Sequence, residues 1–148
     1  MSVGIITEPK VGRVKPCAFI ELEQHNDARG NLSVVESEWT AGFPIERVYY
    51  LHGLDTGSSR GGHAHRALEQ LVIAVHGSFT ITVDDGVNQA EHRLDDAGRG
   101  LYIGPMVWRN LSDFSKDAVS VVLASRHYDE SDYYRDYDEF LRDARRGL

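Results

Sequence analysis

The feature that most constrains this chain is a regular succession of short β-prone segments separated by turn residues. Their spacing of roughly 10 residues is typical of a β-sandwich or barrel. Segments 70–75 and 118–123 are almost continuously apolar, as expected for central strands covered on both faces. Asp85-Gly86 predicts a hairpin turn, because this dipeptide tolerates positive φ. The candidate strands lie at 18–24, 31–35, 46–52, 70–76, 79–84, 89–94, 101–103, 107–111 and 119–124.

The C-terminal part has a different pattern. Beyond Asp129, apolar side chains recur at the spacing of one helix face, at Tyr133, Tyr137, Phe140, Leu141 and Ala144. Acidic residues open this segment and arginines close it, which suits the helix dipole. We therefore expect an all-β domain over 18–126, followed within 127–148 by one amphipathic helix that packs on the β body or on a partner subunit.

Length and composition exclude several classes of protein. A chain of 148 residues predicts one domain. No apolar run approaches the ~20 residues of a membrane helix, and the N-terminus lacks a signal-peptide pattern, so we expect a cytoplasmic protein without a membrane partner. The single Cys17 excludes a disulfide framework and a thiolate zinc site. A net charge of −7 argues against a nucleic-acid polymer as partner.

The strongest candidate for chemistry is His63-Ala64-His65. In a strand, residues i and i+2 point to the same face, so the two imidazoles project together. With Glu69 and Gly77, this spacing resembles the first motif of the cupin superfamily. The resemblance implies a cupin double-stranded β-helix, or jelly roll, which agrees with the strand count. A buried polar pair without a catalytic role is the alternative.

Two kinds of chemistry fit a histidine pair. Two His and a carboxylate are the start of a transition-metal site. Metal-binding cupins usually add a histidine from a second motif, but here Arg109 stands near that place, and a guanidinium is not a normal metal ligand. The other chemistry is proton transfer beside a carbonyl, with imidazole as the base and an arginine stabilising the enolate. We favour proton transfer and expect no metal and no cofactor.

Further motifs resemble the WxcM-like sugar 3,4-ketoisomerases, a family that includes FdtA- and QdtA-type enzymes. The similarity covers about residues 18–141, and its specificity comes from the order and spacing of the motifs. The motifs are Arg29-Gly30-Asn31-Leu32, Arg47-Val48-Tyr49-Tyr50, Arg60-Gly61-Gly62-His63-Ala64-His65, Leu68-Glu69-Gln70, Val83-Asp84-Asp85-Gly86, Gly100-Leu101-Tyr102-Ile103-Gly104-Pro105, Val107-Trp108, Val122-Leu123-Ala124-Ser125 and Tyr128-Asp129-Glu130-Ser131-Asp132-Tyr133.

The resemblance implies a specific reaction. The family converts dTDP-4-oxo-6-deoxy-D-glucose to a 3-oxo isomer without metal or redox cofactor, and a partner aminotransferase then aminates the product toward 3-amino-3,6-dideoxy sugars. A base removes the C3 proton, an enediolate forms, and a proton returns to C4. We expect the catalytic residues to be His63, His65, Arg109 and Tyr50. Which histidine is the base stays open.

The resemblance also gives the arginines and aromatic residues a role. Of the 16 basic residues 13 are Arg, and guanidinium groups suit the diphosphate of a nucleotide sugar. The expected substrate-binding residues are Arg29, Arg47, Tyr49, Arg60, Arg66, Glu69, Tyr102 and Trp108. Packing is an equal alternative for Tyr102 and Trp108, as is a solvated side chain for Arg66. Arg29 and Arg109 occupy positions that vary within the family, so we expect them to influence the gluco or galacto configuration of the product.

Three other functions remain open. A sugar-nucleotide 3,5-epimerase also uses a cupin and a histidine, a non-catalytic cupin could bind a sugar nucleotide, and a metal-dependent cupin enzyme is the third. Sheet edges of cupins are commonly covered by dimerisation, so we expect a homodimer. The segment 1–17 is a candidate for exchange between its subunits.

Overall fold

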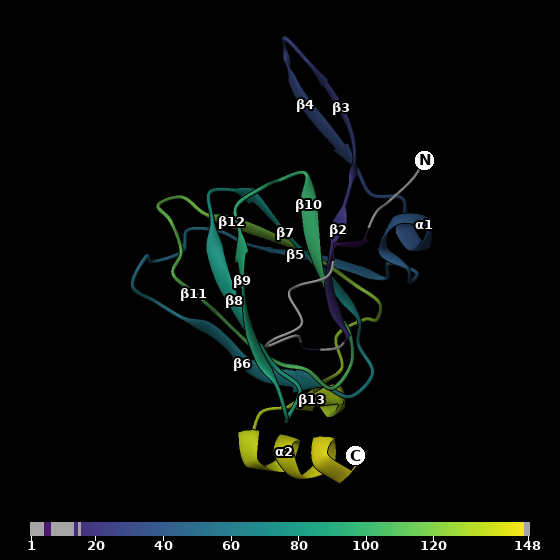
Figure 1. Ribbon diagram of the computed structural model, residues 1–148, viewed down its shortest axis with the longest axis vertical. Coiled ribbons are helices and arrows are strands. Elements are labelled where there is room, and N and C mark those ends of the chain that lie inside the picture. Colours follow the sequence, from purple (N-terminus) through teal and green to yellow (C-terminus); the bar gives the residue numbers. More distant parts are fainter. Residues whose placement is uncertain (1–4, 7–13, 15, 147–148) are drawn as a thin grey trace.

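The computed structural model describes residues 5–6, 14 and 16–146. In this part of the chain, two antiparallel sheets face one another, which confirms the expected all-β, jelly-roll architecture (Figure 1). One sheet has the order β1 (Ile5–Ile6), β2 (Cys17–Glu21), β10 (Arg99–Ile103), β7 (Gln70–His76), β12 (Val119–Ala124), β5 (Arg47–Leu51). The other has the order β13 (Tyr133–Tyr134), β6 (Arg60–His65), β11 (Trp108–Ser112), β8 (Phe79–Asp84), β9 (Gln89–Leu94).

The main core lies between the two sheets. Alternate residues of a strand point to one face, and on β8 these are Phe79, Ile81 and Val83, all with 0–1% of their surface exposed. Leu101 of β10 and Val122 of β12 meet them from the opposite sheet. Removing so much apolar surface from water is the main force that holds the two sheets together.

The outer face of the six-stranded sheet is also covered. Leu71 and Ile73 of β7 and Leu123 of β12 pack there with Ala41 of the short helix α1 (Ser37–Ala41) and with Phe43. The central strands β7 and β12 are therefore buried on both faces, as their continuous apolar sequence predicted. The sequence pattern did not predict α1.

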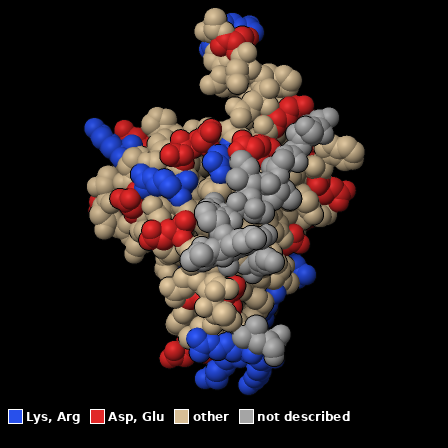
Figure 2. Space-filling model, viewed as in Figure 1, with Lys and Arg blue, Asp and Glu red and all other residues tan. Residues whose placement is uncertain are grey.

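Helix α2 (Tyr137–Arg146) covers part of the outer face of the five-stranded sheet. Its apolar side packs Phe140, fully buried, against Trp108 and Tyr134. The Tyr137 hydroxyl also donates a hydrogen bond to Asp84 of β8. The amphipathic face is confirmed, and Arg145 and Arg146 lie in its last turn. Figure 2 shows basic side chains gathered at this end of the molecule.

Several element boundaries differ from the sequence prediction. The helix expected beyond Asp129 begins only at Tyr137, because residues before it form the 3₁₀ helix η1 (Glu130–Asp132) and strand β13. Strand β13 pairs with β6, whose edge backbone groups need partners. The single strand expected at 18–24 is divided into β2 and β3 (Glu23–Asp27). Strands β7, β8, β9 and β12 have the predicted bounds.

Strands β3 and β4 (Gly30–Val34) form a separate hairpin, which projects from the end of the molecule opposite to α2 (Figure 1). The exchange expected for segment 1–17 lies mostly outside the described residues. Within them, β1 pairs with β2 of the same chain. No helix in the described ranges is long and apolar enough to cross a membrane.

Candidate active site

A cavity of about 230 Å³ opens between the two sheets. The six-stranded sheet contributes Tyr49, Leu51, Gln70, Val72, Ile103 and Val122, the five-stranded sheet contributes Arg60, Gly61, His63, Arg109, Leu111 and Tyr133, and Arg135 follows β13. Three of these side chains are arginines and none is acidic. The cavity is thus suited to an anionic ligand.

A larger hollow, of about 790 Å³, lies elsewhere on the molecule. It is lined by residues of β8, β9 and β11 and by Tyr137, and neither histidine of the pair lines it. The chemistry expected from the sequence therefore belongs to the smaller cavity.

His63 reaches the smaller cavity from β6. Its Cα pairs with that of Arg109 on β11, so imidazole and guanidinium are neighbours across the sheet. Gly61 allows this approach, since it has φ +105° and a Cβ there would lie 2.9 Å from the Arg109 carbonyl oxygen. Burial, then the charge of Arg109, lowers the pKa of His63 to about 4, although the Gly61 backbone opposes this by hydrogen bonding. At neutral pH the imidazole is uncharged and can accept a proton.

His65 lies beside His63 but does not line the cavity. The two rings are 4.9 Å apart and nearly perpendicular, and the Tyr133 ring lies 4.3 Å from that of His65. Only 1% of His65 is exposed, and burial followed by the charge of Arg109 lowers its pKa to about 2. Its Nδ1 atom lies 3.2 Å from a carboxylate oxygen of Asp132.

Arg109 is a buried cation, with 2% of its surface exposed. Its guanidinium donates to the side-chain oxygen of Gln70 and to the Val107 carbonyl. Gln70 in turn donates to the Tyr49 hydroxyl over 3.0 Å, which links the three side chains. No carboxylate among the described residues forms an ion pair with Arg109, so a buried positive charge faces the cavity without an acidic partner.

The cavity rim carries more positive charge. Arg60 lines it directly. The guanidinium of Arg47 lies 5.5 Å from the ring of Tyr49 and 5.8 Å from that of Tyr128. Arg135 lies 4.2 Å above the Tyr133 ring and forms a double hydrogen bond with Glu130.

Eight residues expected at the site do not line this cavity: His65 and Arg47 lie beside residues that do, and six others lie elsewhere. Three of these six are aromatic residues whose side chains lie on the outer face of a strand, because successive side chains of a strand point to opposite faces. Tyr50 is 62% exposed on the face of β5 opposite to Tyr49. The Tyr102 hydroxyl donates to Glu69 on the outer side of the six-stranded sheet. Trp108 packs against α2 on the outer side of the other sheet.

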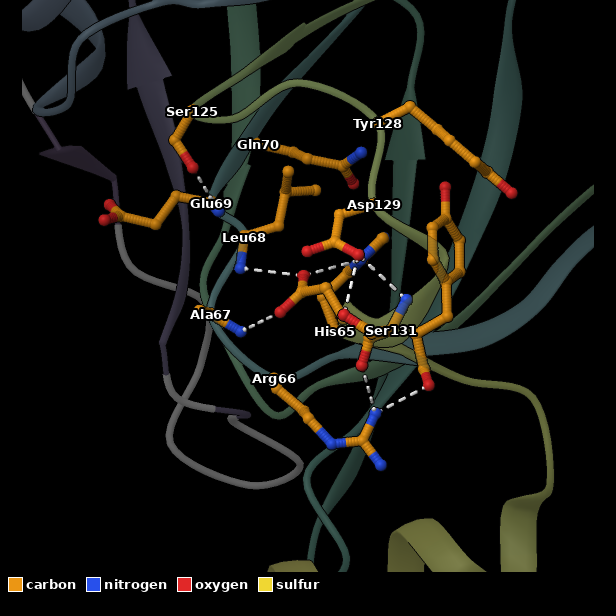
Figure 3. A network of polar contacts seen from close by, with 12 residues as sticks. His65, Arg66, Ala67, Leu68, Glu69, Gln70, Ser125, Tyr128, Asp129 and Ser131 are labelled. Carbon is orange, nitrogen blue, oxygen red and sulfur yellow. Dashed lines mark hydrogen bonds and ion pairs between the residues drawn. The ribbon is translucent and has the colours of Figure 1, made fainter.

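The remaining two arginines have local partners. Arg66 donates to the carbonyl oxygens of Ser131 and Tyr133, so it ties the C-terminal segment to the loop after β6 (Figure 3). Arg29 lies at the tip of the β3–β4 hairpin, where its 90% exposed side chain pairs with Asp27. Neither contact depends on a ligand.

Four residues of the site were not predicted: Gln70, Tyr133, Arg135 and Asp132. The last three lie in the segment expected to be helical, and pairing of β13 with β6 brings them to the histidines. The available signal was the presence of Asp132 and Tyr133 in the tail motif and of Gln70 in Leu68-Glu69-Gln70, whereas Arg135 lies beyond the tail motif. No group of three or more His, Cys, Asp or Glu side chains in the described ranges is arranged to hold a metal ion.

Comparisons with known proteins agree on one family. The model "FdtA: WxcM-like, C-terminal" matches residues 15–145. The TDP-4-oxo-6-deoxy-alpha-D-glucose-3,4-oxoisomerase of Aneurinibacillus thermoaerophilus is 46% identical over 123 residues, which cover 83% of this chain and 88% of that protein.

Solved structures give the same result. A histidine-to-asparagine variant of the 3,4-ketoisomerase QdtA from Thermoanaerobacterium thermosaccharolyticum, in complex with TDP-4-keto-6-deoxyglucose, is similar with a TM-score of 0.88 and 37% identity over 90% of this chain and 96% of its own. The 3,5-epimerase RmlC from Legionella pneumophila shares only 15% identity, with a TM-score of 0.75 over 95% of this chain and 81% of its own, and shows the fold alone. The chain therefore belongs to the WxcM-like FdtA family of sugar 3,4-ketoisomerases.

Proposed function

We infer that this protein isomerises TDP-4-oxo-6-deoxy-D-glucose to a TDP-3-oxo-6-deoxyhexose. The observation that carries the inference is the pairing of an uncharged imidazole, His63, with a buried guanidinium, Arg109, that has no carboxylate partner among the described residues. A base and a fixed positive charge side by side are what enolisation needs. The family of the chain and the names of its relatives point to the same reaction.

The mechanism follows from this geometry. The C4 carbonyl acidifies the C3 proton, which His63 accepts because it is the histidine that lines the cavity. The C3–H electron pair forms the enediolate double bond, and negative charge gathers on the former carbonyl oxygen, where Arg109 stabilises it. The proton is then returned to C4, and the proton of the C3 hydroxyl passes to the former carbonyl oxygen at C4 as the C3 carbonyl forms. Proton and electron pair are conserved, so the step needs no oxidant.

The rim residues are proposed to bind the nucleotide part of the substrate. Arg47, Arg60 and Arg135 supply guanidinium groups for the diphosphate, and such groups bind phosphate oxygens in pairs. Tyr49 and Tyr128 provide flat surfaces nearby. The proposal that the nucleotide base is thymine is supported by the ligands of two QdtA structures, one of which contains TDP-4-keto-6-deoxyglucose and the other TDP.

Arg109 is also proposed to influence which face of C4 receives the proton. Arg29 and Arg109 occupy the two positions that vary within the family. Of these two residues, Arg109 lies at the cavity, whereas Arg29 is on the distant β3–β4 hairpin. NMR of the product made by Arg109→His tests this proposal. An unchanged gluco-to-galacto ratio would remove Arg109 from the stereochemical argument.

We further propose that the protein is a cytoplasmic homodimer. A two-stranded hairpin is only marginally stable alone in water, yet β3 and β4 are exposed along most of their length. Edge strand β5 exposes Val48 by 58% and Tyr50 by 62%, and such edges favour pairing with another chain. A monomer in light scattering would contradict the dimer.

Because the product carries a new carbonyl at C3, an aminotransferase is the proposed next enzyme.

One experiment tests the reaction. The protein, stripped of metal by a chelator, is incubated with dTDP-4-oxo-6-deoxyglucose in D₂O, and the sugar is followed by NMR. We expect a 3-oxo product with deuterium at C4, and loss of turnover in His63→Asn but not in the surface control His52→Asn. Exchange at C5 as well as C3 would indicate a 3,5-epimerase. Turnover only after metal addition, or none, would contradict the inference.

A further inference from the structure

Asp132 is the residue on which the contacts around His65 converge. It ends η1 and is 8% exposed. One of its carboxylate oxygens accepts the Ala67 backbone N–H over 2.8 Å. The other accepts the Leu68 N–H over 3.2 Å and lies 3.2 Å from Nδ1 of His65 (Figure 3). Backbone N–H groups can only donate, so both oxygens serve as acceptors.

These contacts determine which nitrogen of His65 carries the proton. An ionised carboxylate has no proton to donate, so Nδ1 must be the donor in its contact with Asp132. Because the ring is uncharged at neutral pH, Nε2 then has no proton and keeps a free electron pair. Nε2 is buried and makes no hydrogen bond with the described residues, so no other group there imposes the opposite tautomer.

The orientation of His65 matters because it supports the side chains that line the cavity. Its ring lies 4.9 Å from that of His63 and 4.3 Å from that of Tyr133. A rotated or reprotonated His65 would present a donor in place of an acceptor directly behind the proposed base. A His ring held by a carboxylate is a recurring way to fix both tautomer and orientation.

We propose that Asp132 is a positioning residue for the isomerase reaction: it holds His65 as the Nδ1–H tautomer, so that Nε2 remains a proton acceptor behind His63 and Tyr133. The proposal rests on the proposed function for its effect on the rate, but the tautomer itself does not depend on that function. A merely structural alternative is that Asp132 only anchors the C-terminal segment to the Ala67–Leu68 backbone.

The variant Asp132→Asn separates these roles. The amide has the same shape, and its oxygen can still accept a backbone N–H and anchor the segment. With that oxygen kept at the Ala67 N–H, the NH₂ group takes the place of the oxygen that faces Leu68 and His65. The Leu68 hydrogen bond is lost, and because the NH₂ group can only donate to Nδ1 of His65, the ring proton moves to Nε2. We expect kcat to fall about 10²–10⁴-fold, since a wrong tautomer has a cost of this order where an Asp orients a catalytic His. KM should change little.

The direct readout is the ¹⁵N NMR spectrum of the histidine rings, assigned by its loss in His65→Gln. We expect the signal of an unprotonated nitrogen at Nε2 in the wild type and at Nδ1 in Asp132→Asn. The control is Asp143→Asn, which removes a carboxylate that accepts the Tyr134 hydroxyl in the same C-terminal region and should change neither tautomer nor kcat.

Two results would overturn the proposal. One is a wild-type His65 that carries its proton on Nε2. The other is an Asp132→Asn enzyme with the reversed tautomer and unchanged kcat. If the wild-type tautomer is as expected but the protein lacks isomerase activity, the proposed function fails and the assignment of the tautomer stands.

Discussion

The uncharged state of His63 in the folded protein has a measurable consequence for stability in acid. The pKa of its imidazole is lowered from 6.5 to about 4, chiefly by burial and by Arg109. Below pH 6.5 the unfolded chain therefore binds a proton at this position that the folded chain does not bind. Stability rises with pH wherever the unfolded state holds more protons, so this contribution is lost as pH falls from 6.5 toward 4.

The size of the effect follows from the two pKa values. At pH 5 the unfolded imidazole is almost fully protonated, and the native one is almost fully neutral. Integrating the difference from pH 7 to pH 5 gives a loss of about 2 kcal/mol in the free energy of unfolding from His63. His65, whose pKa is lowered to about 2, adds a similar loss, but this loss is common to the wild type and to a His63 variant.

The assay compares the wild type with His63→Asn by guanidinium denaturation at pH 7, 6 and 5. The variant should lose about 2 kcal/mol less than the wild type between pH 7 and pH 5. The surface variant His52→Asn is the matched control and should follow the wild type. Equal acid losses in wild type and His63→Asn would show that the imidazole is not held neutral, and would remove the basis for its role as base.

Three further outcomes are expected. Arg109→Met should lower kcat about 10²–10³-fold, because the substitution removes the charge that stabilises the enediolate. TDP binding, measured by calorimetry, should be largely kept, and an unchanged kcat would contradict this role of Arg109. Tyr102→Phe should leave kcat and KM unchanged, since its hydroxyl contacts Glu69 away from the cavity; a clear loss of activity would place Tyr102 at the site after all. Phe140→Ala should destabilise the protein by about 3–5 kcal/mol in guanidinium denaturation, because a fully buried ring of the α2 contact is lost; a loss below about 1 kcal/mol would show that α2 contributes little.

Local chemistry explains which elements were predictable from the sequence. Strands β7 and β12 were recognised because central strands need apolar residues on both faces, and the β8–β9 hairpin because Asp85-Gly86 suits its turn. Strand β13 was not recognised, because Tyr133 also fits the helical spacing of α2. Its pairing with His65 depends on the edge of β6, about 70 residues earlier in the chain.

The residues of the site likewise fall into those that the local sequence predicts and those that only the tertiary structure brings together. The sequence by itself determined the His63–His65 pair and the arginine at position 109, because a two-residue spacing and a departure from a known motif are visible in one segment of chain. Only the tertiary structure separated Tyr49 from Tyr50 and brought Gln70 to Arg109, since the face that meets the other sheet depends on strand register. It also brought Asp132 to His65, a contact between residues 67 positions apart that no local pattern encodes.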